Sequence, residues 1–181
     1  VRSCINADAD HALMPDLTPY DLIVSALVPY KRIELALEAY RGTGRRLVIA
    51  GGGPDERRLT ALAPPEARLL GPVDDETLRE LYRGCRAVLL TGVEDFGIVP
   101  LEAMACGRPA VVYAEGGASE SIVPGQTGLV FDRANPQSLR AAVDALETVR
   151  FNTLALRQRA EQFSHAAFES RLRGFLASAV E

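Results

Sequence analysis

Short apolar, β-prone segments alternate with helical segments along most of this 181-residue chain. All the predicted strands except the fifth are followed by a turn or helix-capping residue and then by apolar residues at helical spacing. Strands connected by helices in this way form a parallel sheet covered on both faces, with right-handed crossovers. The sequence therefore predicts an α/β fold with a six-stranded parallel sheet. The predicted strands are residues 20–27, 46–50, 67–70, 86–91, 110–113 and 128–131.

The remaining patterns predict helices and a division into three parts. Helices are expected over residues 29–40, 55–63 and 99–106, and another begins after Asp74 as its N-cap. Asn135-Pro136 is expected to start a helix that reaches about Leu146. The first 19 residues show no clear period, and we interpret them as a linker or a remnant of a missing N-terminal domain. Residues 20–150 form the predicted ligand-binding domain. Residues 151–181 are expected to form C-terminal helices that bend near Ser164 and His165.

Composition excludes several classes of protein. A net charge of −4 and a pI of about 5.3 argue against a nucleic-acid binder held by general basicity. No apolar run reaches the roughly 18 residues that a membrane span needs. The 3 cysteines show no metal-binding spacing, which favours a reducing, cytoplasmic location. A hydrophobic content of 48% is enough for a sizeable core.

Two glutamates, Glu94 and Glu102, bracket seven residues between two apolar strands. The first lies in a loop and the second in the first turns of the helix that follows. The free backbone N–H groups at the start of such a helix bind anions. A carboxylate on each side of an anion site suits a ligand that carries both phosphate and hydroxyl groups, such as a nucleotide-sugar.

Further candidate residues follow other predicted strands. Lys31, Gly52 and Val73 each come shortly after a strand end, as do both glutamates. Ligands bind parallel sheets at the carboxyl ends of the strands, so these residues can converge. Lys31 is also the only lysine among the 20 basic residues, which indicates a site that needs a compact ammonium.

Several motifs together resemble a known enzyme family. They are the segment from Val24 to Arg32, Gly51-Gly52-Gly53-Pro54-Asp55, Leu70-Gly71-Pro72-Val73, the run from Glu94 to Pro109, Gly116-Gly117, and the segment from Gly125 to Val130. Their order and spacing resemble the retaining glycosyltransferases of family four, which have the GT-B fold. The resemblance covers about residues 20–132 and implies a Rossmann-like, donor-binding C-terminal half of a two-domain enzyme. It implies a nucleoside diphosphate sugar as substrate, no metal or other cofactor, and an N-terminal acceptor-binding domain as partner.

The resemblance also implies a role for each matching residue. Glu94 matches the glutamate that faces hydroxyls of the donor sugar, and Glu102 the one that binds the ribose. Lys31 matches the lysine that neutralises the diphosphate, so Glu94 and Lys31 are the predicted catalytic residues. The other predicted substrate-binding residues are Arg32, Gly52, Val73 beside the base, and Phe96, Gly97, Ile98 and Val99 at the diphosphate.

One position departs from the family pattern. The family usually has an arginine five residues before the lysine, where this chain has Ala26. Arg32, next to Lys31, or a residue of the missing domain is expected to compensate for this cation.

Alternatives remain open at this level. A GT-B nucleotide-sugar epimerase or a non-catalytic nucleotide-sugar-binding module would share the fold. The two glutamates could simply stabilise the helix by a favourable interaction of their charges with the helix dipole, and Lys31 could be an ordinary surface lysine. The wording Val28-Pro29-Tyr30-Lys31-Arg32 leans towards GDP-mannose as donor. The predicted acceptor is a lipid-linked molecule or a glycan, and the predicted location is the cytoplasm, including peripheral association with the inner membrane face.

Overall fold

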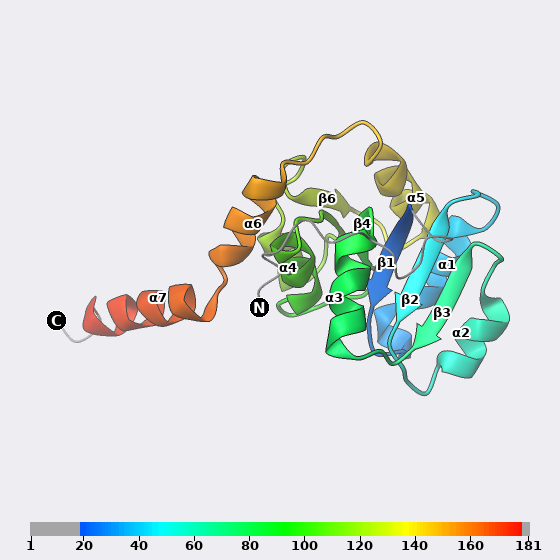
Figure 1. The fold of residues 1–181 in the computed structure, drawn as a ribbon, viewed down its shortest axis with the longest axis horizontal. Coiled ribbons are helices and arrows are strands. Elements are labelled where there is room, and N and C mark those ends of the chain that lie inside the picture. Colours follow the sequence, from blue (N-terminus) through cyan, green and yellow to red (C-terminus); the bar gives the residue numbers. More distant parts are fainter. Residues whose placement is uncertain (1–18, 179–181) are drawn as a thin grey trace.

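The computed structural model describes residues 19–178 and contains one six-stranded parallel sheet (Figure 1). The strand order is β3-β2-β1-β4-β5-β6, and every neighbouring pair is parallel. The chain builds β1, β2 and β3 outward and then returns to place β4 beside β1. This reversal is the switch point at which such sheets bind ligands. The strands are β1 (Tyr20–Val24), β2 (Arg46–Ala50), β3 (Ala67–Gly71), β4 (Ala87–Leu90), β5 (Ala110–Tyr113) and β6 (Gly128–Phe131).

Helices cover both faces of the sheet, as the sequence predicts. Successive strand residues point to opposite faces, so Leu22 joins one apolar cluster and Ile23 another. The cluster around Ile23 includes side chains of α1 (Ile33–Tyr40), α2 (Glu56–Leu62) and α5 (Pro136–Ala145). On the other face lie α3 (Asp75–Gly84) and α4 (Ile98–Ala105), and α6 (Thr153–Glu161) packs against α4.

Helix-capping residues read from the sequence are confirmed. The Asp74 carboxylate accepts a hydrogen bond of 2.7 Å from the Thr77 N–H at the start of α3. The Asn135 side chain accepts one of 2.8 Å from the Ser138 N–H, and Pro136 opens α5. Each cap satisfies an N–H group that has no partner within the helix.

Two of the predicted elements near the first strand are wrong in extent. β1 ends at Val24, not at residue 27, although the Leu27 N–H still donates to the Gly52 carbonyl (3.0 Å) beyond the end of β2. The helix predicted over residues 29–40 is divided into a short 3₁₀ helix, η2 (Pro29–Lys31), and α1. Arg32 separates them in the left-handed region, at φ 52°. Its guanidinium lies 5.4 Å from the centre of the Tyr113 ring, a cation–π contact that favours this break.

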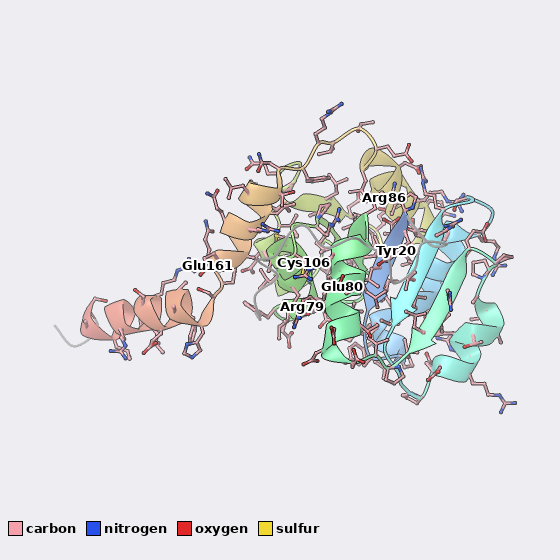
Figure 2. All side chains as sticks on the ribbon, viewed as in Figure 1. Tyr20, Arg79, Glu80, Arg86, Cys106 and Glu161 are labelled. Carbon is pink, nitrogen blue, oxygen red and sulfur yellow. The ribbon has the colours of Figure 1, made fainter. Side chains whose placement is uncertain are left out.

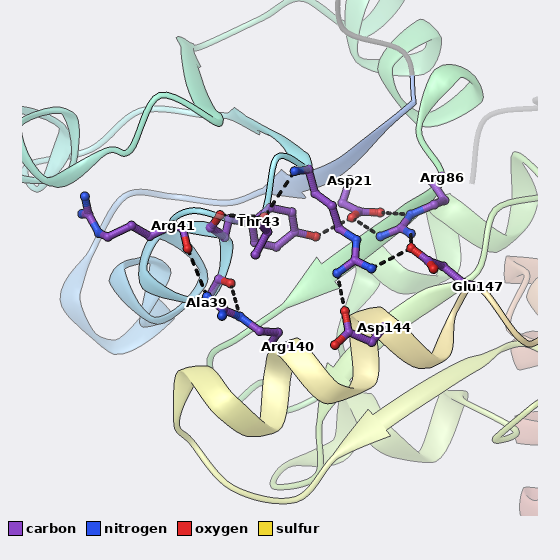
Figure 3. Close-up of polar contacts among 10 residues, drawn as sticks. Asp21, Ala39, Arg41, Thr43, Arg86, Arg140, Asp144 and Glu147 are labelled. Atoms are coloured by element: carbon purple, nitrogen blue, oxygen red, sulfur yellow. Dashed lines mark hydrogen bonds and ion pairs between the residues drawn. The ribbon is translucent and has the colours of Figure 1, made fainter.

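The amino ends of the strands are held by a charged network (Figure 3). Asp21, at the start of β1, is buried and accepts two hydrogen bonds from Arg86, of 3.0 and 2.6 Å. The Tyr40 hydroxyl at the end of α1 donates to the same carboxylate. Arg45 connects this edge to the end of α5 through ion pairs with Asp144 and Glu147. These contacts lie at the edge of the sheet opposite the predicted site and connect β1, α1 and the end of α5.

The last described helix contributes no buried residue to the core. Figure 2 shows the side chains of α7 (His165–Ser178) extending away from the sheet, whereas the labelled Tyr20 lies within the body. The Tyr20 hydroxyl donates to the Leu81 carbonyl of α3 (2.9 Å). Two C-terminal helices, separated near Ser164, confirm the predicted bend. The linker predicted over residues 1–19 lies outside the described residues except for Pro19.

Candidate functional site

A cavity of about 660 Å³ lies at the carboxyl ends of the central strands. Its walls come from the ends of β1, β2, β3 and β4, together with the loop and first turn that begin α4. This volume is in the range of small-molecule and cofactor sites. Lining residues predicted from the sequence are Lys31, Gly52, Val73, Glu94, Phe96, Gly97, Ile98 and Val99.

Lys31 and Glu94 form an ion pair at this cavity, between the Lys31 Nζ and the Glu94 Oε1. Both side chains are largely shielded, with exposed fractions of 16% and 21%. The Lys31 Nζ also lies 5.0 Å from the centre of the Tyr30 ring, which is itself exposed at the cavity. The two predicted catalytic residues are therefore in direct contact with each other.

Close backbone packing holds the Lys31 turn against the segment that follows β4. The Thr91 hydroxyl donates to the Lys31 carbonyl (2.7 Å). A Cβ at Gly92 would lie 2.8 Å from both the Lys31 Cα and the Tyr30 carbonyl oxygen, so only glycine allows this approach. These contacts fix the backbone from which the Lys31 side chain reaches Glu94.

A second set of glycines shapes the loop before α4. Gly97 has φ 75° and caps α4 without any side-chain hydrogen bond to the helix N–H groups. The loop pairs with the segment before η3 (Gly117–Ser121) through a parallel bridge between Glu94 and Gly116. A Cβ at Gly117 would lie 1.9 Å from the Asp95 carbonyl oxygen. This packing directs the start of α4, with its unsatisfied N–H groups, into the cavity.

Glycines also form the opposite wall. Gly51 has φ 130°, and a Cβ there would lie 2.0 Å from the Ser25 carbonyl oxygen. A Cβ at Gly52 would lie 2.9 Å from the Pro72 ring. The turn after β2 therefore packs directly on its neighbours and leaves a flat backbone surface beside Val73.

Two predicted binding residues do not line the cavity. Arg32 stacks on Tyr113 instead, so its guanidinium is not placed to supply the cation that Ala26 lacks. Glu102 lies on α4 and accepts a 2.7 Å hydrogen bond from the buried Tyr82 hydroxyl. Burial, followed by the Glu102 charge, raises the pKa of the Tyr82 phenol well above its ordinary value. The structure thus brings Glu94, but not Glu102, to the cavity surface.

Sequence reasoning missed several cavity residues. Tyr30 and Asp95 both line it, and each is adjacent in sequence to a predicted catalytic residue. Their positions next to Lys31 and Glu94 in the sequence could have identified them as cavity residues. Thr91, which holds the Lys31 carbonyl, had no signal in the sequence because the contact depends on tertiary packing.

Among residues 19–178, no group of three or more histidine, cysteine, aspartate or glutamate side chains could hold a metal ion. In the same residues no helix is both long and apolar enough to cross a membrane. A reaction that needs no metal stays a prediction.

Comparison with known proteins identifies the family. Residues 12–167 match the family described as glycosyl transferases group 1. The chain belongs to this family. Among its relatives is an uncharacterized glycosyltransferase, MJ1607, of Methanocaldococcus jannaschii, which is 36% identical over 133 residues, covering 68% of this chain and 34% of the relative. Another is the D-rhamnosyltransferase WbpZ of Pseudomonas aeruginosa, 33% identical over 130 residues and covering 67% of this chain and 34% of WbpZ.

Solved glycosyltransferases share the fold of this family member. The apo form of the lipopolysaccharide outer core galactosyltransferase WaaB matches with a TM-score of 0.81 and 19% identity, covering 91% of this chain and 50% of WaaB. Anabaena HepE, solved with UDP and glucose, matches with a TM-score of 0.69 and 22% identity, covering 88% of this chain and 48% of HepE. The Rossmann-like fold prediction is confirmed. The chain spans about a third of the length of its named relatives and half of these structures.

Proposed function

We propose that this chain is the donor-binding half of a retaining hexosyltransferase of the GT-B class. In this role it holds a nucleoside diphosphate sugar while a second, N-terminal domain presents the acceptor. The observation that carries the proposal is the cavity at the sheet's switch point, where Lys31, Glu94 and the start of α4 meet. The cation and the free helix N–H groups match the diphosphate of such a ligand, and the carboxylate matches its sugar hydroxyls.

The proposed chemistry is electrostatic. The Lys31 ammonium and the N–H groups from Phe96 to Val99 would stabilise the negative charge that develops on the departing diphosphate. The Glu94 carboxylate would accept hydrogen bonds from sugar hydroxyls and orient the ring as it gains oxocarbenium character. The resemblance assigns Val73 to the face of the base and Glu102 to the ribose, although Glu102 lies outside the cavity lining and one of its oxygens accepts a hydrogen bond from Tyr82.

Two observations bear on which nucleotide and which sugar the donor contains. The segment from Val28 to Arg32 favours GDP-mannose, whereas the structural neighbour HepE was solved with UDP and glucose. The test therefore includes both nucleotides. The alternative of an epimerase loses support because the relatives named above are glycosyltransferases. A lipid-linked or glycan acceptor and a cytoplasmic location also remain proposals.

Calorimetry on the 181-residue chain tests the proposed function. We expect GDP, UDP or ADP to bind, and we expect no turnover of the corresponding nucleotide-sugar without the acceptor domain. Adenosine, guanosine and uridine serve as matched ligands that lack phosphate and should bind more weakly. Failure of all three diphosphates to bind at millimolar concentration would overturn the proposal.

A further inference from the structure

The cavity has an unusual balance of charge. Of the described residues that line it, Lys31 is the only cation, whereas Glu94 and Asp95 are both acidic. The Lys31 ammonium is paired with the Glu94 carboxylate. A bare diphosphate would therefore meet a cavity in which the one cation among the described lining residues already has a partner.

We infer that Glu94 and the diphosphate compete for Lys31, so that the ion pair acts as a latch against nucleotides that carry no sugar. If Lys31 turns to the phosphates, the largely shielded Glu94 carboxylate loses its partner, which is unfavourable. The phosphates therefore gain their cation only when Lys31 leaves Glu94. The cost of breaking this pair makes the bare nucleoside diphosphate bind less tightly than it would to an unpaired lysine.

A donor sugar removes this penalty. Two neighbouring hydroxyl groups can donate hydrogen bonds to both oxygens of the Glu94 carboxylate. The carboxylate then has new partners when Lys31 moves to the diphosphate. The latch thus favours the intact donor over the nucleoside diphosphate that remains after transfer, and it promotes release of that product. This inference rests on the proposed function and specifies how its two catalytic residues are coupled.

The surrounding structure limits other ways to relieve the competition. The Lys31 backbone is fixed by the Thr91 hydroxyl and by its close approach to Gly92. The Glu94 backbone is fixed by its bridge to Gly116. Because neither backbone segment can readily withdraw, breaking the pair requires side-chain motion of Lys31 or Glu94.

Glu94→Gln tests the latch, with Asp95→Asn as a matched control. Both substitutions remove one negative charge from the same cavity, but the structure pairs only Glu94 with Lys31. Calorimetry on the 181-residue chain uses inorganic pyrophosphate, GDP, UDP and the sugar nucleotides GDP-mannose and UDP-glucose. We expect Glu94→Gln to raise affinity for pyrophosphate and the nucleoside diphosphate by about fivefold or more. Its preference for the sugar nucleotide over the diphosphate should fall. Asp95→Asn, whose side chain is exposed, should change affinity by less than about twofold.

A second measurement does not depend on a variant. Because Lys31 is the only lysine in the sequence, ¹³C-labelled lysine gives a single side-chain NMR signal set. Pyrophosphate or the nucleoside diphosphate should move this signal in the unmodified chain as Lys31 leaves Glu94. Binding that leaves the Lys31 signal in place would overturn the latch, even if Glu94→Gln failed to fold.

The outcomes separate the latch from the proposed function. If the unmodified chain binds a diphosphate but Glu94→Gln gains nothing, the latch is wrong and the donor site remains. An equal gain in Asp95→Asn would show an effect of net charge and would also overturn the latch. If neither the unmodified chain nor Glu94→Gln binds any probe, the proposed function fails, and the latch fails with it.

Discussion

Gly92→Ala should damage both the stability of the fold and the candidate site. The new Cβ would lie 2.8 Å from the Lys31 Cα and 2.8 Å from the Tyr30 carbonyl oxygen. Both are backbone atoms, so a side-chain rotation cannot relieve the contact, and the η2 turn must move away from the end of β4. Such overpacking costs about 1–3 kcal/mol, which corresponds to a loss of roughly 2–12 °C in Tm for a chain of this size.

Displacement of the turn should also move Lys31 away from the cavity, so that its ammonium no longer reaches the phosphates, and this should lower affinity for the nucleoside diphosphate that the unmodified chain binds. Thermal unfolding and calorimetry measure the two effects. Gly174→Ala in α7 is the matched control, because a Cβ there meets nothing within 4 Å. An unchanged Tm together with unchanged nucleotide binding in Gly92→Ala would refute the argument that this close approach positions Lys31.

Two further predictions follow from individual side chains. Lys31→Ala should weaken diphosphate binding by roughly tenfold and nucleoside binding much less, because a charge-assisted hydrogen bond contributes about 1.5–3 kcal/mol; calorimetry with GDP and guanosine, or the uridine pair, makes the comparison. Stability should fall as the pH rises above about 10, because burial raises the folded-state pKa of Tyr20, Tyr40 and Tyr82 above the unfolded value. Below that pH the three neutral phenols contribute fully to the free energy of unfolding. A free energy of urea unfolding that is unchanged between about pH 9 and 11 would contradict this prediction.

The strands and caps could be predicted because their signals are local. β5 and β6 have the predicted bounds, and Asp74 and Asn135 cap helices as expected. Each depends on a short apolar run or on a side chain that bonds an N–H group a few residues away. Convergence of Lys31, Gly52, Val73 and Glu94 on one cavity also follows, because parallel strands share a carboxyl edge.

The break at Arg32 could not be predicted because its cause lies far away in the sequence. The helical pattern continues through this position, and Pro29 is a favourable start for a helix. The left-handed conformation of Arg32 accompanies a contact with Tyr113 at the end of β5. Only the packed sheet brings that ring beside the turn, so the side chain expected to replace a missing cation points elsewhere.

The Lys31–Glu94 pair escaped prediction for a similar reason. The sequence assigns the two residues to separate parts of a ligand, which implies that their substitutions have separate effects. In the structure the two side chains form an ion pair. The close backbone approach at Gly92 that supports this pair forms only when the segment after β4 packs against η2, so it has no local signal in the sequence. Their binding effects are therefore expected to be coupled.

Ala26, which stands where the family usually has an arginine, provides a test of the coupling between Lys31 and Glu94. Ala26 is exposed and lines the cavity, so Ala26→Arg would add a second cation near the phosphates without displacing core side chains. After a discount for solvent exposure, the added contact should raise affinity for the nucleoside diphosphate by about two- to tenfold. The phosphates would then depend less on Lys31, so Glu94→Gln should produce a smaller gain in affinity in the Ala26→Arg background than alone.

Ala26→Gln, which adds a long but uncharged side chain, is the control in the same calorimetric series. Additive effects of the two substitutions would show that the new arginine and Lys31 serve separate parts of the ligand, and weaker binding in Ala26→Arg would show that the arginine pairs with a cavity carboxylate instead.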